Sequence, residues 1–275
     1  MRKTSRLGYL AVIFALGMTP TVWADSPAKV TEVVNVVKHG SRSGKVPAEV
    51  GTLVHDGEYV QTEGKSRAAV LLPTTSVTRL GSSTIFNYSV AANTIDLEQG
   101  TVLFCKPKGA ERLNITTAGI SAGITGTTGF VSVHEVNGKA TYTLGLIEGH
   151  AVVVPKGNPP FPIGSGDIVQ FTPGTKPFSF AFDLPRFVKS SPLLNGFKGT
   201  LPNQAYIDRA LEEYASNVSR GFIVPPSNKI TYAGPIPVLS MVAYSSAQNA
   251  NQPRGQAAPP PPPTSPRGPS SFPSH

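Results

Sequence analysis

The sequence predicts an all-β fold, either a β-sandwich or a rolled β-barrel built from many short strands. Three observations support this expectation. Apolar and polar residues alternate in several short segments, which is the period of a half-buried strand. Turn signals recur every ~8–12 residues between these segments. Glycine and proline are abundant, at 27 residues each in a chain of 275, and this favours a chain with many turns over a helical one.

The composition and charge exclude some classes of partner. Charged residues make up 15% of the chain, and the formal net charge is +8. The basic residues are scattered and form no cluster of the kind that marks a nucleic-acid footprint, so we expect no nucleic-acid partner. A positive charge favours contact with anionic envelope polymers, although simple solubility accounts for it equally well.

The N-terminus has the pattern of an export signal. Arg2, Lys3 and Arg6 precede an apolar run over residues 7–18, and small residues end at Ala24. The run is too short for a permanent membrane helix, which needs ~20 residues, so we expect a signal peptide over residues 1–24. An uncleaved anchor is the alternative. Cleavage after Ala24 would leave a net charge of +5, no transmembrane anchor, and a protein that is periplasmic or secreted.

A β-domain is expected over residues 25–190. Residues 68–72 and 151–154 are continuously apolar and suit strands that are covered on both faces. Alternation is clear at residues 95–98, where Ile and Leu alternate with Asp and Glu, and again at 178–182, where three phenylalanines alternate with Ser and Ala. Each alternating segment predicts a strand with one buried and one wet face.

The strongest hairpin signal is Asn137-Gly138, which lies between two strand-like segments at residues 130–136 and 139–146. This dipeptide suits a tight turn in which both residues adopt positive φ. The glycine-rich segment 119–129 lacks the residue order of a P-loop or a dinucleotide fold. It leads into residues 130–133, which resemble a strand, so its glycines are read as backbone turns and not as a phosphate site.

One amphipathic helix is expected in an extension over residues 191–245. Asn203 is positioned to cap it, Arg209 and Glu213 form an i,i+4 pair, and Gly221 and Pro225 end it. We expect its apolar stripe to pack on the β-domain, with partner binding as the alternative. The stripe has helical spacing and consists of Tyr206, Ile207, Ala210, Leu211, Tyr214 and Val218.

A disordered proline-rich tail is expected over residues 246–275. Nine of the last 25 residues are proline, including the run 259–263. Such a segment cannot bury enough apolar surface to order itself. Docking of the polyproline run into an aromatic groove is the alternative.

The search for catalytic chemistry gives no site, so the sequence predicts no enzyme, cofactor or metal. Cys105 is the single cysteine and lies in an apolar segment, which suits a buried thiol. No GxSxG elbow is present. The histidines lie far apart and none shows HExxH spacing, although two flank the hairpin and could approach each other: His39, His55, His134, His150 and His275. The acidic residues read as strand-edge charge: Asp56, Glu58, Asp96, Glu98, Glu148 and Asp167.

The order of these segments resembles a FecR-type periplasmic domain. The resemblance extends over about residues 45–172. Its opening "G…l..Gd.v.T" matches Gly51 to Thr62, and its "gvrGT.f.v" core matches Gly123 to Val133. Further matching segments occur in the family's order, at residues 66–72, 76–84, 97–102, 115–118, 147–153 and 164–169.

The resemblance implies an all-β domain outside the cytoplasm, with no catalytic residues to carry over. In the ferric-citrate system such domains relay a signal from an outer-membrane transporter to a sigma factor. This chain is expected to lack the cytoplasmic anti-sigma segment and the retained membrane helix, so direct sigma-factor contact is not expected. Its binding residues stay unknown at this stage.

Two functions remain open from the sequence. The first is a non-enzymatic module that binds another envelope protein, with strand addition at a sheet edge as one way of binding. The second is a protein associated with the cell wall or a polysaccharide, with or without weak hydrolytic activity. The positive charge and abundant hydroxyl groups support the second function, but neither is specific to it.

Overall fold

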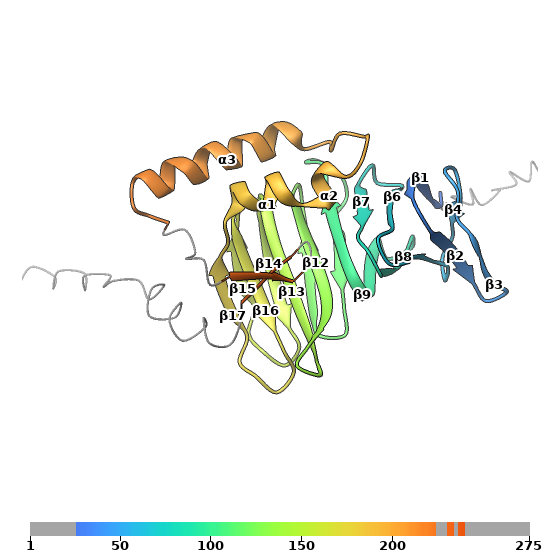
Figure 1. The fold of residues 1–275 in the computed structure, drawn as a ribbon, viewed down its shortest axis with the longest axis horizontal. Coiled ribbons are helices and arrows are strands. Elements are labelled where there is room, and N and C mark those ends of the chain that lie inside the picture. The colour runs from blue at the N-terminus through green and yellow to red at the C-terminus, as the bar shows by residue number, and fades with distance from the viewer. Residues whose placement is uncertain (1–25, 224–229, 234–235, 240–275) are drawn as a thin grey trace, which may run out of the picture.

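The computed structural model describes residues 26–223, 230–233 and 236–239. The expected signal peptide, the expected stop at Pro225 and the expected proline-rich tail lie outside the described residues. The described chain is mostly β, as the sequence predicts, and its strands form two facing sheets that share one long strand, β9 (Thr94–Cys105) (Figure 1). A separate hairpin contains β18 (Ile230–Ala233) and β19 (Ile236–Leu239).

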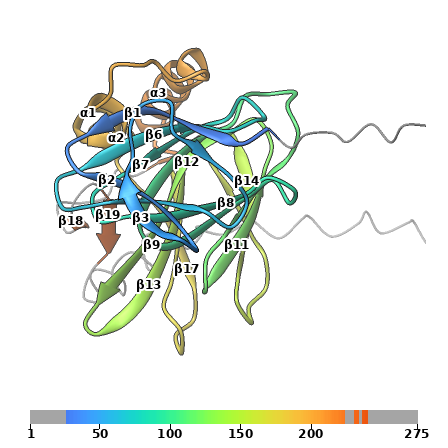
Figure 2. The same cartoon turned by 90° about the vertical axis from the view of Figure 1, so that its right-hand side faces the viewer.

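Neighbouring strands are antiparallel throughout both sheets, except for the parallel pair β9–β10. Sheet A contains, in spatial order, β4 (Leu53–Val54), β1 (Ala28–Val34), β6 (Arg67–Leu71), β7 (Val77–Leu80), the second half of β9, β12 (Thr128–Val136), β13 (Lys139–Glu148), β16 (Asp167–Phe171) and β17 (Phe178–Ala181). Sheet B contains β3 (Gly44–Pro47), β2 (Val37–Ser41), β5 (Tyr59–Thr62), β8 (Ile85–Ser89), the first half of β9, β10 (Leu113–Thr116), β11 (Ile120–Ile124), β14 (His150–Pro155) and β15 (Phe161–Gly164). Viewed from the N-terminal end, β13 lies on one side of the sandwich and β11 and β14 lie on the other (Figure 2).

Strand β9 passes from sheet B to sheet A at Gly100. Gly100 has φ +89°, and a Cβ there would lie 2.5 Å from the Cα of Thr84. Both observations exclude a larger residue, because L side chains avoid this conformation and the contact is sterically forbidden. Glycine at this position therefore allows one strand to serve both sheets.

Two apolar clusters hold the layers together. The larger lies between the sheets and includes Val60, Phe86 and Leu144. The second lies on the outer face of sheet A, where three helices cover the end at which β12 begins and β13 ends. The helices are α1 (Leu184–Ser190), α2 (Pro192–Asn195) and α3 (Gln204–Ser219).

Aromatic rings join α1 to sheet A. Phe130 of β12 stacks on Phe187 of α1, with ring centroids 4.8 Å apart, and makes a T-shaped contact with Phe182 at 5.9 Å. Such pairs contribute about 0.5–1.5 kcal/mol each beyond the burial of their area. The phenylalanine alternation at residues 178–182 is confirmed, because Phe180 and Phe182 are buried in this cluster while Ser179 is exposed.

The other strand predictions have mixed outcomes. The Asn137-Gly138 turn is confirmed, since it joins β12 to β13 with φ +52° and +72°. Burial of the run 68–72 on both faces holds for Ala68, Ala69 and Val70, but it is wrong for Leu71, which is 38% exposed. The same expectation for 151–154 is wrong, because Val152 and Val154 are 48% and 38% exposed. They lie on the outer face of sheet B, which the helices do not cover.

The sequence predicted one helix, in the extension over residues 191–245, whereas the described residues contain three helices. The predicted helix is α3, which packs on sheet A through Ile207, Ala210 and Tyr214. The helices α1 and α2 were not predicted, because each is too short to show helical periodicity. Local residues nonetheless mark where these two helices begin. The side chains of Asp183 and Ser191 cap α1 and α2, and each helix has a proline in its first turn.

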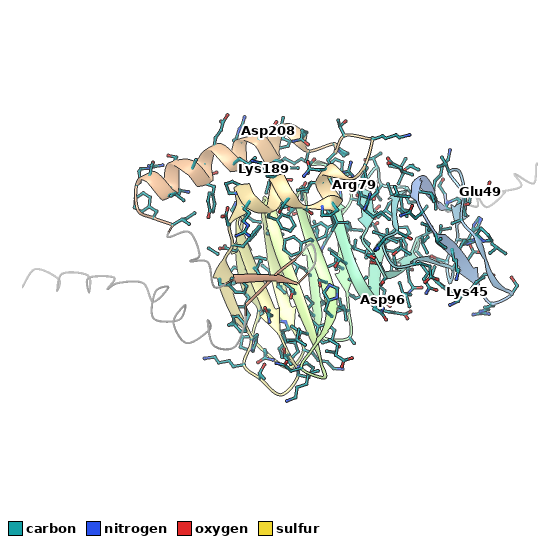
Figure 3. All side chains as sticks on the ribbon, in the orientation of Figure 1. Lys45, Glu49, Arg79, Asp96, Lys189 and Asp208 are labelled. Carbon is teal, nitrogen blue, oxygen red and sulfur yellow. The ribbon has the colours of Figure 1, made fainter. Side chains whose placement is uncertain are left out.

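Arg79 of β7 anchors the segment between α2 and α3 (Figure 3). Its guanidinium is buried, donates to the carbonyls of Leu193 (2.9 Å), Leu194 (3.0 Å) and Gly199, and lies 4.7 Å from the ring centroid of Phe197. Burial lowers the pKa of Arg79 from its ordinary value. A buried arginine of this kind satisfies carbonyls that the end of a helix leaves unpaired.

We expect Arg79→Met to lower the free energy of unfolding by about 3 kcal/mol, because methionine keeps the apolar stem but leaves the carbonyls of Leu193, Leu194 and Gly199 without their donor. Lys189→Met, at an exposed residue of α1, is the matched control and should change it by less than about 0.5 kcal/mol. Urea unfolding of both variants measures the difference. Equal midpoints for the two variants would show that Arg79 is no anchor.

Candidate functional site

The outer face of sheet B is the open face of the sandwich. Along β8, β9, β10 and β11, its outward side chains are polar and half-buried or exposed: Asn87, Asp96, Glu98, Thr116 and Ser121. Towards β14 and β15 the face becomes apolar, through Val152, Val154 and Pro162. This change from polar to apolar surface coincides with a hollow over β11, β14 and β15.

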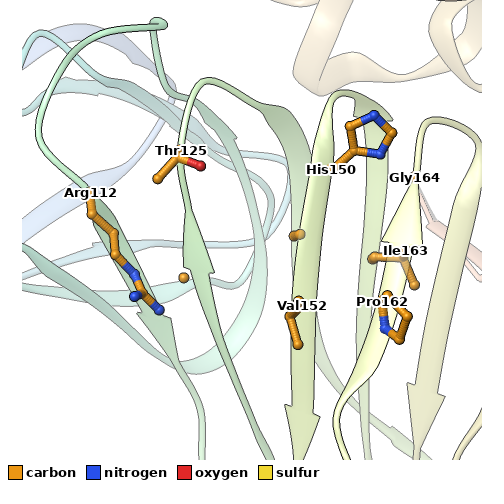
Figure 4. Close-up of a pocket in the computed structure, with 9 residues that line it drawn as sticks. Arg112, Thr125, His150, Val152, Pro162, Ile163 and Gly164 are labelled. Carbon is orange, nitrogen blue, oxygen red and sulfur yellow. The ribbon is translucent and has the colours of Figure 1, made fainter.

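That hollow, the sheet B groove, has a volume of about 720 Å³ and lies over β11, β14 and β15 (Figure 4). Arg112 lies on one side of it, and His150 and Pro162 lie on the other. Two glycines, Gly123 and Gly164, leave space above its floor because they have no side chains. The guanidinium of Arg112 occupies the place of a side chain at Gly123, and the ring of His150 lies 3.4 Å from where a Cβ of Gly164 would be.

A second hollow, the α3 pocket, adjoins the groove and has a volume of about 380 Å³. It lies between α3 and the loops at the start of β12 and the end of β13, and it shares Thr125 and His150 with the groove. Lys108 and Arg209 line it, and the Nζ of Lys108 lies 3.8 Å from the ring centroid of Tyr206. The two hollows therefore form one continuous surface.

The cations of this surface form no ion pairs. Within the described residues, the ion pairs are Lys38–Glu63 (2.7 Å) and His39–Glu58 (2.8 Å), both in the N-terminal half of the chain. The expected pair between Arg209 and Glu213 is not formed. Both side chains are exposed on α3, where such a pair gains only about 0.3–0.5 kcal/mol against the entropy of two long side chains.

Two carboxyl groups near the α3 pocket have structural roles. Burial raises the pKa of Glu148, whose Oε1 accepts hydrogen bonds from Thr128 Oγ1 (2.8 Å) and Asn203 Nδ2 (2.7 Å). Burial also raises the pKa of Asp167, whose Oδ2 accepts from the backbone N–H of Gly164 (2.9 Å).

Asn203 does not cap α3 with its side chain as the sequence predicted. It occupies the N-cap position, but its amide points into sheet A and also donates to the carbonyl of Lys106 (2.9 Å). The amide nitrogen of Asn203 donates to the buried carboxyl of Glu148. This hydrogen bond is stronger than the one that the amide oxygen would accept from an N–H group at the start of the helix. Asn203 therefore fixes the start of α3 to the sheet.

The other residues considered for chemistry lie apart. Cys105 is buried, and burial raises the pKa of its thiol, which disfavours the reactive thiolate. His134 lies in sheet A beside Thr101 (3.1 Å), and burial lowers its pKa. His150 lies in sheet B, so the hairpin does not bring His134 and His150 together. No group of three or more His, Cys, Asp or Glu placed to hold a metal occurs among the described residues.

The expectation that the glycine-rich segment 119–129 is a turn between strands is correct only in part. Residues 120–124 form β11, and the turn lies at Gly126, which adopts φ +67° before β12 begins. The other acids also have partners in the fold. Glu58 Oε2 accepts from the backbone N–H of His55 (2.8 Å) and contacts His39, and these hydrogen bonds lower the pKa of Glu58. Asp96 Oδ1 accepts from Thr116 Oγ1 (3.2 Å), and Glu98 Oε1 accepts from Asn87 Nδ2 (2.8 Å). Asp56 Oδ1 accepts from the backbone N–H of Val90. Local turns and contacts between neighbouring strands thus account for these acids.

A comparison with protein families gives a match for the central part of this fold. Residues 58–152 match the family model described as FecR protein. The chain contains a FecR-type domain. The matched range runs from the turn before β5 into β14 and so includes Arg112, Gly123 and His150 of the groove.

Other comparisons add little to the family match. Two crystal structures of a "putative anti-sigma factor" from Parabacteroides distasonis align with a TM-score of 0.40 and 11% identity, over 45% of this chain and 59% of that chain. The chain thus spans less than two thirds of these neighbours. A search of curated proteins gives no match. No helix among the described residues is long and apolar enough to cross a membrane.

The two edges of sheet B are poor sites for strand addition. On β15, Pro162 has no N–H and the N–H of Gly164 is taken by Asp167. The opposite edge strand of sheet B, β3, has only four residues and contains Lys45 and Pro47. Short edges with lysine, proline or occupied donors resist pairing with another chain. The open face of sheet B is therefore the better candidate for binding.

Arg112, Lys108 and Arg209 were not singled out as binding residues by sequence analysis. Arg112 precedes β10 and Lys108 follows β9, whereas Arg209 lies on α3 about a hundred residues later. Nothing in their local sequence distinguishes them from solvated surface charges. The only signal available was the group of glycines at 119–129, which lies beside them in the fold.

The raised pKa of Glu148 gives a test of the network around Asn203. A raised pKa in the folded state means that stability falls as the pH rises through the range above about 4.5, where the unfolded carboxyl ionises. We expect Glu148→Gln to unfold at higher urea concentration than the wild type at pH 7. This difference should disappear below about pH 4.5, where the carboxyl is neutral in both states.

The control is Glu148→Ala, which removes the acceptor of Asn203 and Thr128. It should lower the free energy of unfolding by about 2 kcal/mol at both pH values, because buried donors lose their partner. A Gln variant that is as destabilised as the Ala variant would contradict the prediction that ionisation of Glu148 has a cost.

Proposed function

We propose that this chain is an exported, non-enzymatic FecR-domain protein that binds another protein of the cell envelope, as an interaction or signalling-associated module. The proposal includes a signal peptide at residues 1–24, a FecR-like β-domain at 25–190, a helix-containing extension at 191–245 and a disordered tail at 246–275. It places the mature protein in the periplasm or outside the cell, without a membrane anchor.

The observation that carries this proposal is the continuous surface formed by the sheet B groove and the α3 pocket within and beside the FecR-type domain. A wide sheet face with an apolar floor and cationic sides suits contact with a protein surface. The non-enzymatic part is supported by the structural roles of Glu148, Asp167 and Cys105, all of which are engaged in the fold.

Polysaccharide binding remains the competing function. Sugar sites usually offer an exposed aromatic face, and the only aromatic residue lining the two hollows is Tyr206, over which Lys108 lies. No feature of the two hollows favours polysaccharide binding, and the capture experiment below tests it directly.

Export predicts a defined mature protein. In cells that express the full chain, the protein in the periplasmic or culture fraction should begin at Asp25, because a signal peptidase would cut after Ala24. Intact-mass spectrometry of that fraction measures the new terminus. Protein of full-length mass, retained in the inner membrane, would contradict export by cleavage.

Binding predicts specific capture. The tagged full chain, expressed in its own cells, should enrich one envelope protein from solubilised envelopes, and untagged protein should compete it away. Quantitative mass spectrometry against a tag-only control measures the enrichment. If isolated cell walls bind the chain saturably in low and high salt and no protein is enriched, the polysaccharide function replaces this one.

A further inference from the structure

The sheet B groove and the α3 pocket together present a row of basic side chains, which we call the basic cleft. Arg112 lies at one end, and His150 and Thr125 lie at the junction of the two hollows. Lys108 and Arg209 line the α3 pocket, and Arg209 belongs to α3 itself. These residues come from β14, α3 and the loops that flank β9 and β10. The fold therefore assembles the cleft from distant parts of the chain.

We propose that the basic cleft binds an extended acidic peptide segment of the partner. This inference rests on the proposed function, because it assumes that the partner is a protein, and it adds where and through what chemistry that protein binds.

Charge is the first argument. None of Arg112, Lys108, His150 and Arg209 forms an ion pair among the described residues, whereas Lys38 and His39 elsewhere on the sandwich do. Of the residues that line the two hollows, the carboxyls are those of Glu148, which is buried and hydrogen-bonded, and Glu213. The carboxyl of Asp167 also lies near His150, and it accepts a hydrogen bond from Gly164. A surface with unpaired cations and few opposing carboxylates is complementary to an anionic ligand.

The floor of the groove is the second argument, and it favours a peptide over a charged polymer. It is apolar, through Ala151, Val152, Pro162 and Ile163, and Val152 is 48% exposed. A peptide in extended conformation directs alternate side chains to opposite sides. Apolar side chains can then cover this floor while acidic side chains reach the cations. A uniformly charged polysaccharide would leave the floor uncovered.

The position of Arg112 is the third argument. Its guanidinium lies over Gly123, where any side chain would displace it, and Figure 4 shows it directed along the groove. The absence of a side chain at Gly123 thus lets the guanidinium lie against β11 on one side of the groove. A planar guanidinium is suited to a carboxylate, because it can donate two parallel hydrogen bonds.

The test uses the mature full-length protein and a fluorescein-labelled peptide of about ten residues in which glutamate alternates with valine, roughly 33 Å when extended. Matched peptides carry glutamine or lysine in place of glutamate. Fluorescence anisotropy at about 0.05 M and 0.5 M salt measures the Kd, since attraction between exposed charges is screened by salt. Polygalacturonate, an anionic polysaccharide, serves as an unlabelled competitor.

We expect the glutamate peptide to bind at least about tenfold more tightly than the glutamine peptide, and less tightly at high salt. Arg112→Glu and Arg209→Glu should each weaken binding by about tenfold, because they reverse exposed charges that have no structural partner. Lys139→Glu makes the same change in charge on the β12–β13 hairpin, outside both hollows, and should stay within about twofold. Gly123→Ala should weaken binding without reversing any charge, by displacing Arg112.

Three results would overturn the inference: no saturable binding of the glutamate peptide, equal weakening by Lys139→Glu and Arg112→Glu, or binding of polygalacturonate alone. Unfolding midpoints of the variants confirm that the fold is intact. Envelope capture with Arg112→Glu separates this inference from the proposed function. If the variant enriches the same protein as the wild type, the function stands and the cleft is not its site; if neither enriches any protein, the function itself fails.

Discussion

The packing of Phe130 against Phe182 and Phe187 couples the helical layer to sheet A, and the remaining architecture depends on it. Sheet A is apolar on its inner face and on part of its outer face, so that part must be covered. The helices α1 to α3 cover it, and Arg79 and Asn203 fix the connecting segments through buried hydrogen bonds. With its helices committed to one sheet, the chain leaves the other sheet open.

The open sheet explains why the candidate site lies where it does. Sheet B shares its core with sheet A through β9 and needs no further cover to be stable. Its outer face can therefore carry a groove and unpaired cations without loss of the core. Charged residues also have two distinct roles. Acids such as Glu148 and Asp167 form hydrogen bonds that stabilise the fold, whereas exposed cations such as Arg112 and Arg209 are free to bind.

Much of the strand pattern was predictable from local sequence, and the site was not. The hairpin at Asn137-Gly138 and the alternation at residues 178–182 depend on neighbours within a few residues, so their sequence signals are strong. The error at residues 151–154 shows the limit of such signals. A run of valines indicates a strand, but whether both faces are covered depends on which sheet the strand joins and on where the helices pack.

The sequence by itself determined the all-β class, the FecR-type resemblance, the helix at α3 and the burial of Cys105, because each follows from short-range periodicity, turn residues or motif order. Only the tertiary structure decided that Asn203 binds Glu148 in preference to capping its helix, and that Arg112, Lys108, His150 and Arg209 share one surface. Both outcomes depend on contacts between residues far apart in the chain, and the free energy of such contacts is set by burial and geometry that no local segment contains.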